Sequence, residues 1–150
     1  MPDNTIVTNR KARYNYAILE ILEAGIELKG TEVKSLRSGQ ASLNDSFGKI
    51  ENNEVFLYNL YIPPYEFGNI ANVESIRPRK LLLHKREIRH LAETLGAKHL
   101  TLVPLKLYFK KGRAKIEIAL AKGKQKYDKR ETIRKRESDK ELRRIHRAKN

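Results

Sequence analysis

Alternation of hydrophobic and polar residues along much of this chain predicts a domain built mainly from β-strands. Residues 17–28 are largely apolar with glutamates between them, which predicts one long bent strand with a bulge at Gly25. Alternating leucines in residues 100–109 predict another strand, with a bulge or a sheet edge at Pro104, because proline cannot donate to a ladder. Lys111-Gly112-Arg113 is predicted to make the turn to a last strand, in which Ile116, Ile118 and Leu120 point inward.

Two shorter strands are predicted in the middle of the chain, at residues 45–50 and 55–62. Asn52 and Asn53 lie between them, and residues of this kind are typical of a tight hairpin turn. We therefore expect the two strands to be antiparallel neighbours.

Two helices are predicted from apolar residues that repeat at the helical period. In residues 85–95 the apolar side chains, Ala92 among them, fall on one face, and Gly96 follows at a position typical of a helix end. Residues 32–37 form a shorter predicted helix, with Thr31 as its N-cap.

Together these elements predict a mainly β fold, an OB-fold-like closed antiparallel barrel of about six strands with two or three helices. Closure removes the strand edges that an open sheet would present. The barrel is expected to occupy residues 1–123, with residues 1–8 as a loose leader and residues 65–79 as a long loop.

The charge of the chain adds a functional expectation to this fold. Its 150 residues include 32 Lys and Arg against 18 Asp and Glu, a formal net charge of +14. Such an excess attracts polyanions, nucleic acid first and anionic membrane second. Because the chain has no cysteine, no apolar stretch of membrane-spanning length and no signal peptide, we expect a cytoplasmic protein without disulfides that does not bind membranes.

Half of the excess charge lies in the C-terminal tail, residues 124–150. These residues include 12 Lys and Arg and 5 acidic residues, a net charge of +7. The few apolar residues cannot offset the entropy of ordering, so we expect the free tail to be disordered. It contains no glycine or proline, and residues 138–141 resemble a capping box, so the tail is expected to become helical when phosphates neutralise it. A solvated, solubilising tail is the alternative.

No catalytic site is predicted. The four histidines lack the spacing of a metal site with a carboxylate partner, and no nucleophile elbow or phosphate-binding glycine loop occurs. Asp45 and Glu51 are candidates for a carboxylate pair, but nothing in the sequence places them together. We therefore expect a non-enzymatic protein with no metal and no cofactor.

Five short stretches of the chain resemble one known family, the SmpB proteins, which bind tmRNA in bacterial trans-translation. The stretches are Gly-Thr-Glu-Val-Lys-Ser-Leu-Arg at 30–37, Arg-Lys-Leu-Leu-Leu-His at 79–84, Thr-Leu-Val-Pro-Leu at 101–105, Ala-Lys-Gly-Lys at 121–124 and Asp-Lys-Arg at 128–130. They occur in the order of the family, and the resemblance extends from about residue 9 to the end.

The resemblance implies an RNA-binding adaptor. Proteins of this family hold the tRNA-like domain of tmRNA (SsrA RNA) and deliver it to stalled ribosomes, together with elongation factor Tu bound to Ala-tmRNA. Their tail occupies the small-subunit decoding centre and the empty mRNA channel, so that the nascent peptide is tagged for degradation and the ribosome is rescued. A monomer is expected, since nothing suggests an obligate oligomer.

Matched residue by residue, the tmRNA-binding positions of the family correspond to Glu23, Leu82 and His84. Leu82 is expected to pack against a base or ribose, with a core leucine as the alternative, and His84 to hydrogen-bond or stack on RNA. Glu23 is an unusual contact for a polyanion, so it is expected to orient a neighbouring cation or to accept a hydrogen bond from a base or 2′-hydroxyl. Phosphate contacts are further assigned to Lys11, Arg13 and Lys34.

The resemblance also implies that one set of tail residues binds the ribosome. They are Tyr127, Asp128, Lys129, Arg130, Arg134, Lys135, Arg136, Leu142 and Ile145. Some relatives have, in place of Tyr127, a histidine that stacks on an rRNA base; tyrosine keeps the stacking surface but lacks the titratable nitrogen.

Two other classes of protein stay open from the sequence. A structural ribosomal or general RNA-binding protein would remain on ribosomal subunits in high salt and would show no preference for a tRNA-like RNA. An RNA-processing enzyme would degrade RNA when supplied with a divalent metal.

Overall fold

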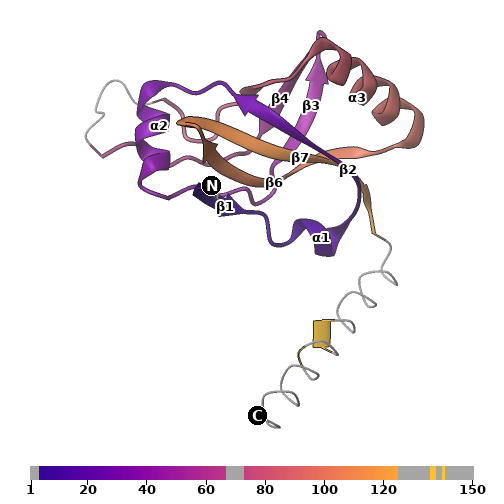
Figure 1. Ribbon diagram of the computed structural model, residues 1–150, viewed down its shortest axis with the longest axis horizontal. Coiled ribbons are helices and arrows are strands. Elements are labelled where there is room, and N and C mark those ends of the chain that lie inside the picture. The colour runs from indigo at the N-terminus through magenta and orange to yellow at the C-terminus, as the bar shows by residue number, and fades with distance from the viewer. Residues whose placement is uncertain (1–3, 67–72, 125–135, 138–139, 141–150) are drawn as a thin grey trace.

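The computed structural model describes residues 4–66, 73–124, 136, 137 and 140. This part of the chain is mainly β, as predicted, and Figure 1 shows α2 and α3 at opposite ends of the strands. The elements in chain order are β1 (Asn4–Thr8), α1 (Ala12–Asn15), β2 (Tyr16–Ile26), α2 (Gly30–Arg37), β3 (Phe47–Glu51), β4 (Glu54–Tyr58), β5 (Arg79–Leu82), α3 (Lys85–Lys98), β6 (Thr101–Lys110) and β7 (Arg113–Gly123).

Six of the strands form a closed antiparallel ring. Hydrogen-bonded neighbours follow the order β6-β3-β4-β5-β2-β7, and β7 pairs again with β6, which closes the barrel. The predicted closed barrel of about six strands is therefore confirmed. The predicted loose leader is wrong for residues 4–8, because β1 pairs with β6 outside the ring and packs Ile6 and Val7 against the core. Five residues were too few to show a strand period in the sequence.

The barrel closes where β3 meets β6, at the single residue pair Gly48 and Leu102. A Cβ atom on Gly48 would lie 2.8 Å from the Cβ of Leu102, a distance that real side chains do not tolerate. Glycine at this position therefore lets the two backbones approach closely enough to complete the ring.

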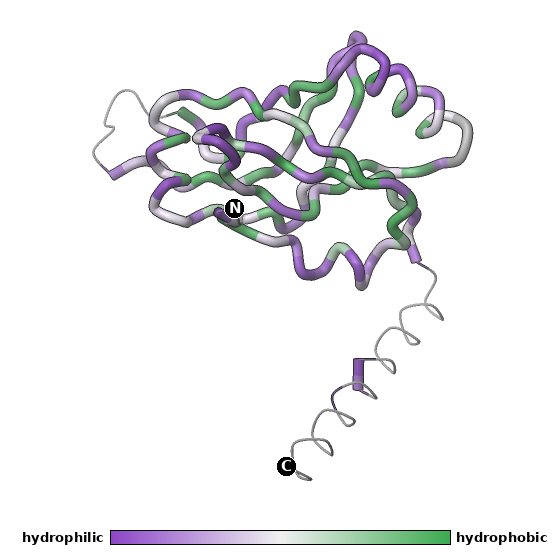
Figure 2. The backbone as a smooth tube through the Cα atoms, viewed as in Figure 1, coloured by the Kyte–Doolittle hydropathy of each residue, from purple (hydrophilic) through white to green (hydrophobic). Residues whose placement is uncertain are grey.

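The barrel interior is filled by inward-facing strand residues. Hydrophobic and hydrophilic residues alternate along the strands, as Figure 2 shows. Ile116, Ile118 and Leu120 of β7 are at most 1% exposed, so the predicted inward face of the last strand is confirmed. The hairpin turn predicted between the two middle strands is also confirmed. Asn52 and Asn53 both have positive φ, at 50° and 61°, as the tight turns that suit twisted strands require.

Both predicted bulges lie on long strands, and one of them is misplaced. The register of β6 against β7 shifts between Pro104 and Lys106, which confirms the bulge predicted at proline. The register of β2 against β7 shifts between Ile18 and Glu20, well before Gly25. Gly25 instead lies in a tightly packed position, since a Cβ there would lie 3.2 Å from the Cβ of the cross-strand Leu82 and would require a small shift of that side chain.

The two predicted helices are present, with different ends. The longer helix, α3, passes through Gly96 and ends at Lys98, and His99 with a φ of 50° takes the left-handed terminal conformation instead. A glycine inside a helix costs only about 1 kcal/mol, which the rest of the helix outweighs. Of its predicted apolar face Leu91 is fully buried, whereas Ala92 is exposed. The N-cap of α2 is Lys29 rather than Thr31.

Candidate nucleic-acid interface

A groove of about 540 Å³ lies where β2, β5, β7 and the start of α3 meet. Glu23 from β2, Leu82 from β5 and His84 at the start of α3 all line this groove, with Lys80 and Lys115 beside them. The structure thus brings together the three residues that the resemblance matched to tmRNA-binding positions, although 61 positions separate the first from the last. We call this hollow the 82–84 groove.

Leu82 points into the groove because side chains alternate along β5. Its neighbour Leu81 faces the core and is 1% exposed, whereas Leu82 is 51% exposed. The reading of Leu82 as a core residue is therefore wrong. An exposed leucine at the wall of a hollow offers apolar surface to a base or a ribose.

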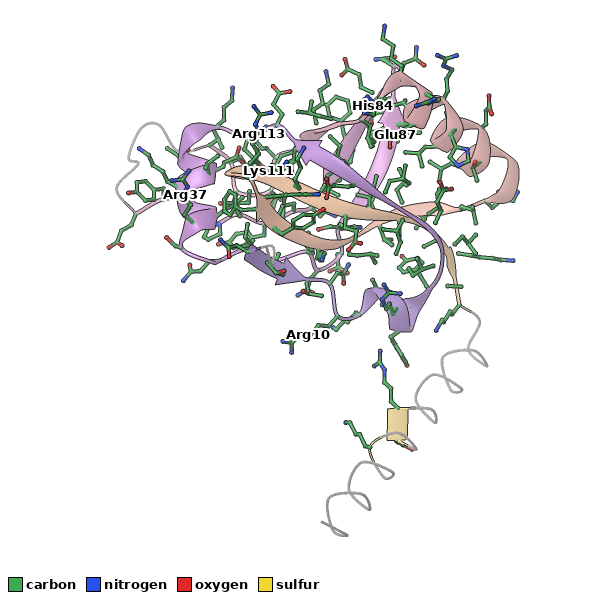
Figure 3. The ribbon with its side chains drawn as sticks, viewed as in Figure 1. Arg10, Arg37, His84, Glu87, Lys111 and Arg113 are labelled. Atoms are coloured by element: carbon green, nitrogen blue, oxygen red, sulfur yellow. The ribbon has the colours of Figure 1, made fainter. Side chains whose placement is uncertain are left out.

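His84 is the N-cap residue of α3, and its side chain is exposed. Its backbone N–H donates to the Glu87 carboxylate at a distance of 2.9 Å, so the N–H of the N-cap residue has a hydrogen-bond partner. Figure 3 shows the two residues close together. This capping contact holds the backbone of His84 at the rim of the groove.

The carboxylate of Glu23 is held from two sides. The Tyr108 hydroxyl donates to it, and the ammonium of Lys110 lies 3.4 Å from Oε2. The Tyr108 hydrogen bond, which outweighs the opposing effect of burial, lowers the pKa of Glu23, and the charges of Lys110 and Lys115 lower it further. Glu23 is therefore an oriented, ionised acceptor, and its contact with Lys110 fits the expectation that it orients a neighbouring cation.

Tyr108→Phe is expected to raise the pKa of Glu23 towards its ordinary value, because the substitution removes the strongest of the influences that lower it. The titration of the Glu23 side-chain carboxyl carbon, followed by NMR, measures this change. Tyr58→Phe is the matched control, since the Tyr58 hydroxyl donates to Glu51 instead. An unchanged Glu23 titration in Tyr108→Phe would show that this hydrogen bond does not set the pKa.

The three predicted phosphate contacts lie away from the 82–84 groove. Lys11 lines a second hollow of about 470 Å³ beside α1, β3 and β6, and Arg13 is exposed on α1. Lys34 is exposed on α2, with its ammonium 5.7 Å from the centre of the Tyr65 ring. The structure does not join these cations into one site, and their role as phosphate contacts stays a prediction.

Most of the predicted ribosome-binding residues lie outside the described part of the chain. Arg136 is described, and it is helical and exposed. The residues outside the described ranges are Tyr127, Asp128, Lys129, Arg130, Arg134, Lys135, Leu142 and Ile145. The expected disorder of the free tail concerns the same segment and stays a prediction.

A buried ion pair that the sequence analysis missed supports the strand that carries Leu82. Arg79 of β5 and Glu32 of α2 are 0% and 4% exposed, and the Arg79 Nε donates to the Glu32 carboxylate at 2.7 Å. Arg79 also donates to the carbonyl oxygens of Leu60, Ser75 and Arg77, at distances of 2.5 to 3.1 Å. The pair thus joins α2, β5 and the segment that precedes β5.

The surroundings of Glu32 keep it ionised despite its burial. Burial raises its pKa, but hydrogen bonds from Arg77 and from the Lys29 backbone, together with the charge of Arg79, bring the pKa below its ordinary value. The only sequence signal for this pair was that both residues lie in stretches that resemble the SmpB family.

The described residues offer no arrangement typical of a catalytic centre. Asp45 lies in the turn that precedes β3 and Glu51 is the last residue of that strand, so the length of β3 separates them and they do not form a pair. Within residues 4–66 and 73–124 no group of three His, Asp or Glu side chains is placed to hold a metal ion. No helix in the described ranges is long and apolar enough to cross a membrane.

A basic closed barrel, with an exposed leucine and histidine in a groove that lysines flank, defines a nucleic-acid-binding barrel protein. The family model described as SmpB protein matches residues 6–148. The chain belongs to the SmpB family, whose members are non-enzymatic RNA-binding proteins.

Individual relatives agree with this assignment. The chain is 60% identical to the SsrA-binding protein of Caldicellulosiruptor bescii over 138 residues, which are 92% of this chain and 87% of the relative. It is 57% identical to the SsrA-binding protein of Desulforudis audaxviator over 148 residues, 99% of this chain and 97% of the relative. A chain in the solved structure described as "tmRNA-SmpB: a journey to the center of the bacterial ribosome" is 51% identical, with a TM-score of 0.68, covering 89% of this chain and 96% of that chain.

Proposed function

We propose that this protein is the adaptor of trans-translation that binds the tRNA-like domain of tmRNA and delivers it to stalled ribosomes. The observation that carries the proposal is the meeting of Glu23, Leu82 and His84 in one groove of a basic barrel. Membership of the SmpB family and the names of the relatives support tmRNA as the RNA that is bound and the ribosome as the target.

The groove is suited to RNA that exposes unstacked bases and 2′-hydroxyl groups. Leu82 packs against a base or ribose, and the His84 ring stacks or hydrogen-bonds beside it. The Glu23 carboxylate, held by Tyr108 and ionised, accepts a hydrogen bond from an amino group or a 2′-hydroxyl. This arrangement selects a particular RNA surface. A carboxylate repels phosphates and forms a favourable contact only with a hydrogen-bond donor placed opposite it.

The tail acts on the ribosome and not on tmRNA. Its residues occupy the small-subunit decoding centre and the empty mRNA channel, where the phosphates of rRNA neutralise its net charge of +7 and favour a helix. The barrel, residues 1–123, and the tail, residues 124–150, are in this proposal two separately acting parts. The protein works in the cytoplasm as a monomer, with elongation factor Tu bound to Ala-tmRNA.

His84→Ala is expected to weaken the binding of tmRNA about tenfold, since loss of a stacked ring costs about 1–3 kcal/mol per base. His84→Asn is expected to retain most of the affinity if the contact is a hydrogen bond, and to lose it if the contact is stacking. Binding to labelled tmRNA at a fixed salt concentration measures both variants. His90→Ala, which removes an exposed histidine that does not line the groove, is the control.

The proposal as a whole is tested by sequencing the RNA that co-purifies with the tagged protein from its own cells. We expect strong enrichment of one tRNA-like RNA. A heterogeneous mixture of RNA, together with retention on ribosomal subunits in high salt, would favour a structural ribosomal protein instead.

A further inference from the structure

The turn between β6 and β7 carries three basic residues within four positions, with one glycine among them. Lys110 ends β6, Lys111 and Gly112 form the turn with φ of 52° and 77°, and Arg113 begins β7. All three basic side chains are exposed, and Figure 3 labels Lys111 and Arg113 near this end of β7. We call these residues, 110–113, the basic hairpin.

Of the three cations of the basic hairpin, one has an acidic partner among the described residues. Lys110 contacts Glu23 at 3.4 Å, whereas within residues 4–66 and 73–124 neither Lys111 nor Arg113 forms an ion pair. The acids Glu23 of β2 and Glu117 of β7 lie opposite each other, and Lys115 of β7 adds a further cation. The surface therefore has an excess of positive charge that is directed at solvent.

The basic hairpin is continuous with the 82–84 groove. Lys110 touches Glu23, which lines the groove, and Lys115 lines the groove from β7. Lys115 lies two positions from Arg113, which is about 7 Å along a strand. A polyanion whose bases or riboses lie in the groove can therefore extend its backbone over the basic hairpin without leaving the protein surface.

We propose that the basic hairpin is a phosphate-binding extension of the tmRNA site. Lys110, Lys111 and Arg113 bind the backbone of the RNA that occupies the groove. This inference rests on the function proposed above and adds residues that the sequence analysis did not assign.

The chemistry of the basic hairpin favours RNA backbone over other partners. None of its four residues is apolar, whereas a membrane-binding surface needs apolar side chains that enter the lipid. None is aromatic, and its charges can meet phosphates without reading sequence. The hairpin therefore contributes affinity, and the groove contributes selectivity.

The double variant Lys111→Asn with Arg113→Gln tests the proposal. Asparagine tolerates the positive φ at position 111, so the turn and the thermal unfolding temperature are expected to stay unchanged. Affinity for tmRNA is expected to fall roughly tenfold at about 0.1 M salt, and the slope of log K against log salt to decrease by about 1.5, because each phosphate contact contributes about 0.7–0.9. Binding to an unrelated RNA should fall by a similar factor.

Lys49→Gln serves as the control for the loss of an exposed lysine elsewhere on the barrel, since Lys49 is an exposed strand lysine that lines neither hollow. An unchanged salt slope in the double variant would overturn the phosphate role of the hairpin while leaving the groove intact. A lower preference for tmRNA over unrelated RNA, with the slope unchanged, would also overturn it. The unmodified protein distinguishes failure of this inference from failure of the proposed function. If the proposed function were wrong, the unmodified protein would show no preference for tmRNA over unrelated RNA.

Discussion

Glu32→Gln is expected to lower the free energy of unfolding by about 3–5 kcal/mol, the range observed when one partner of a buried ion pair is removed. The substitution leaves the Arg79 guanidinium, which is fully buried, without its counter-charge. The pair also positions the segment before β5, because Arg79 holds three of its carbonyl oxygens. Chemical denaturation monitored by circular dichroism measures the change.

The same pair predicts how stability depends on pH. The pKa of Glu32 in the folded protein lies below its ordinary value of 4.5, so the folded state favours the ionised carboxylate. Its contribution is therefore complete above the ordinary value and is lost as the pH falls through the lower, folded value. Glu32→Gln should remove this part of the acid sensitivity, which denaturation at a series of pH values detects.

Glu54→Gln is the matched control for Glu32→Gln. Glu54 also forms an ion pair, with Lys80 at 3.5 Å, but the side chains of both partners are well exposed. Exposed pairs of this kind contribute about 0–1 kcal/mol because water and salt screen them. If Glu32→Gln destabilised the protein no more than Glu54→Gln, the buried pair would not be the support of β5 that its geometry indicates.

Truncation after Gly123 is expected to abolish the tagging of nascent chains on stalled ribosomes and to leave tight tmRNA binding in place. The truncation removes half of the excess charge but none of the residues that line the 82–84 groove or form the basic hairpin. Gly123 is the last residue of β7, and it pairs with Tyr16, so the barrel keeps all its strands. Filter binding of tmRNA and a tagging assay in a reconstituted translation system measure the two activities.

A tail of unchanged composition in shuffled order is the control for charge alone. Restored tagging with the shuffled tail would show that the tail is only an electrostatic anchor, and the assigned roles of Tyr127, Asp128, Lys129 and Arg130 would then be wrong. Loss of tmRNA affinity on truncation would contradict the division between barrel and tail.

Several features of the fold followed from the sequence because they depend on local chemistry. Alternating residues in β7 identified its inward face, and Asn52 with Asn53 identified a hairpin turn, since both signals act over a few positions. The charge asymmetry of the tail was likewise visible in the sequence, because it needs only counting. Matching to the family identified Glu23, Leu82 and His84 as candidates, but not where they lie.

Tertiary structure decided which of these residues meet, and which way each side chain points. Leu81, Leu82 and Leu83 are chemically alike, so only the pairing of β5 shows that Leu82 faces outward into the groove.

The buried pair of Glu32 and Arg79 was invisible in the sequence, because 47 positions separate them and each alone is an ordinary surface residue type. The closure at Gly48 was equally invisible, since a close approach depends on a strand more than fifty positions away. Local periodicity and charge determined the strands, the turns and the basic tail, whereas contacts distant in sequence determined the groove, its oriented carboxylate and the continuity of the basic hairpin with it.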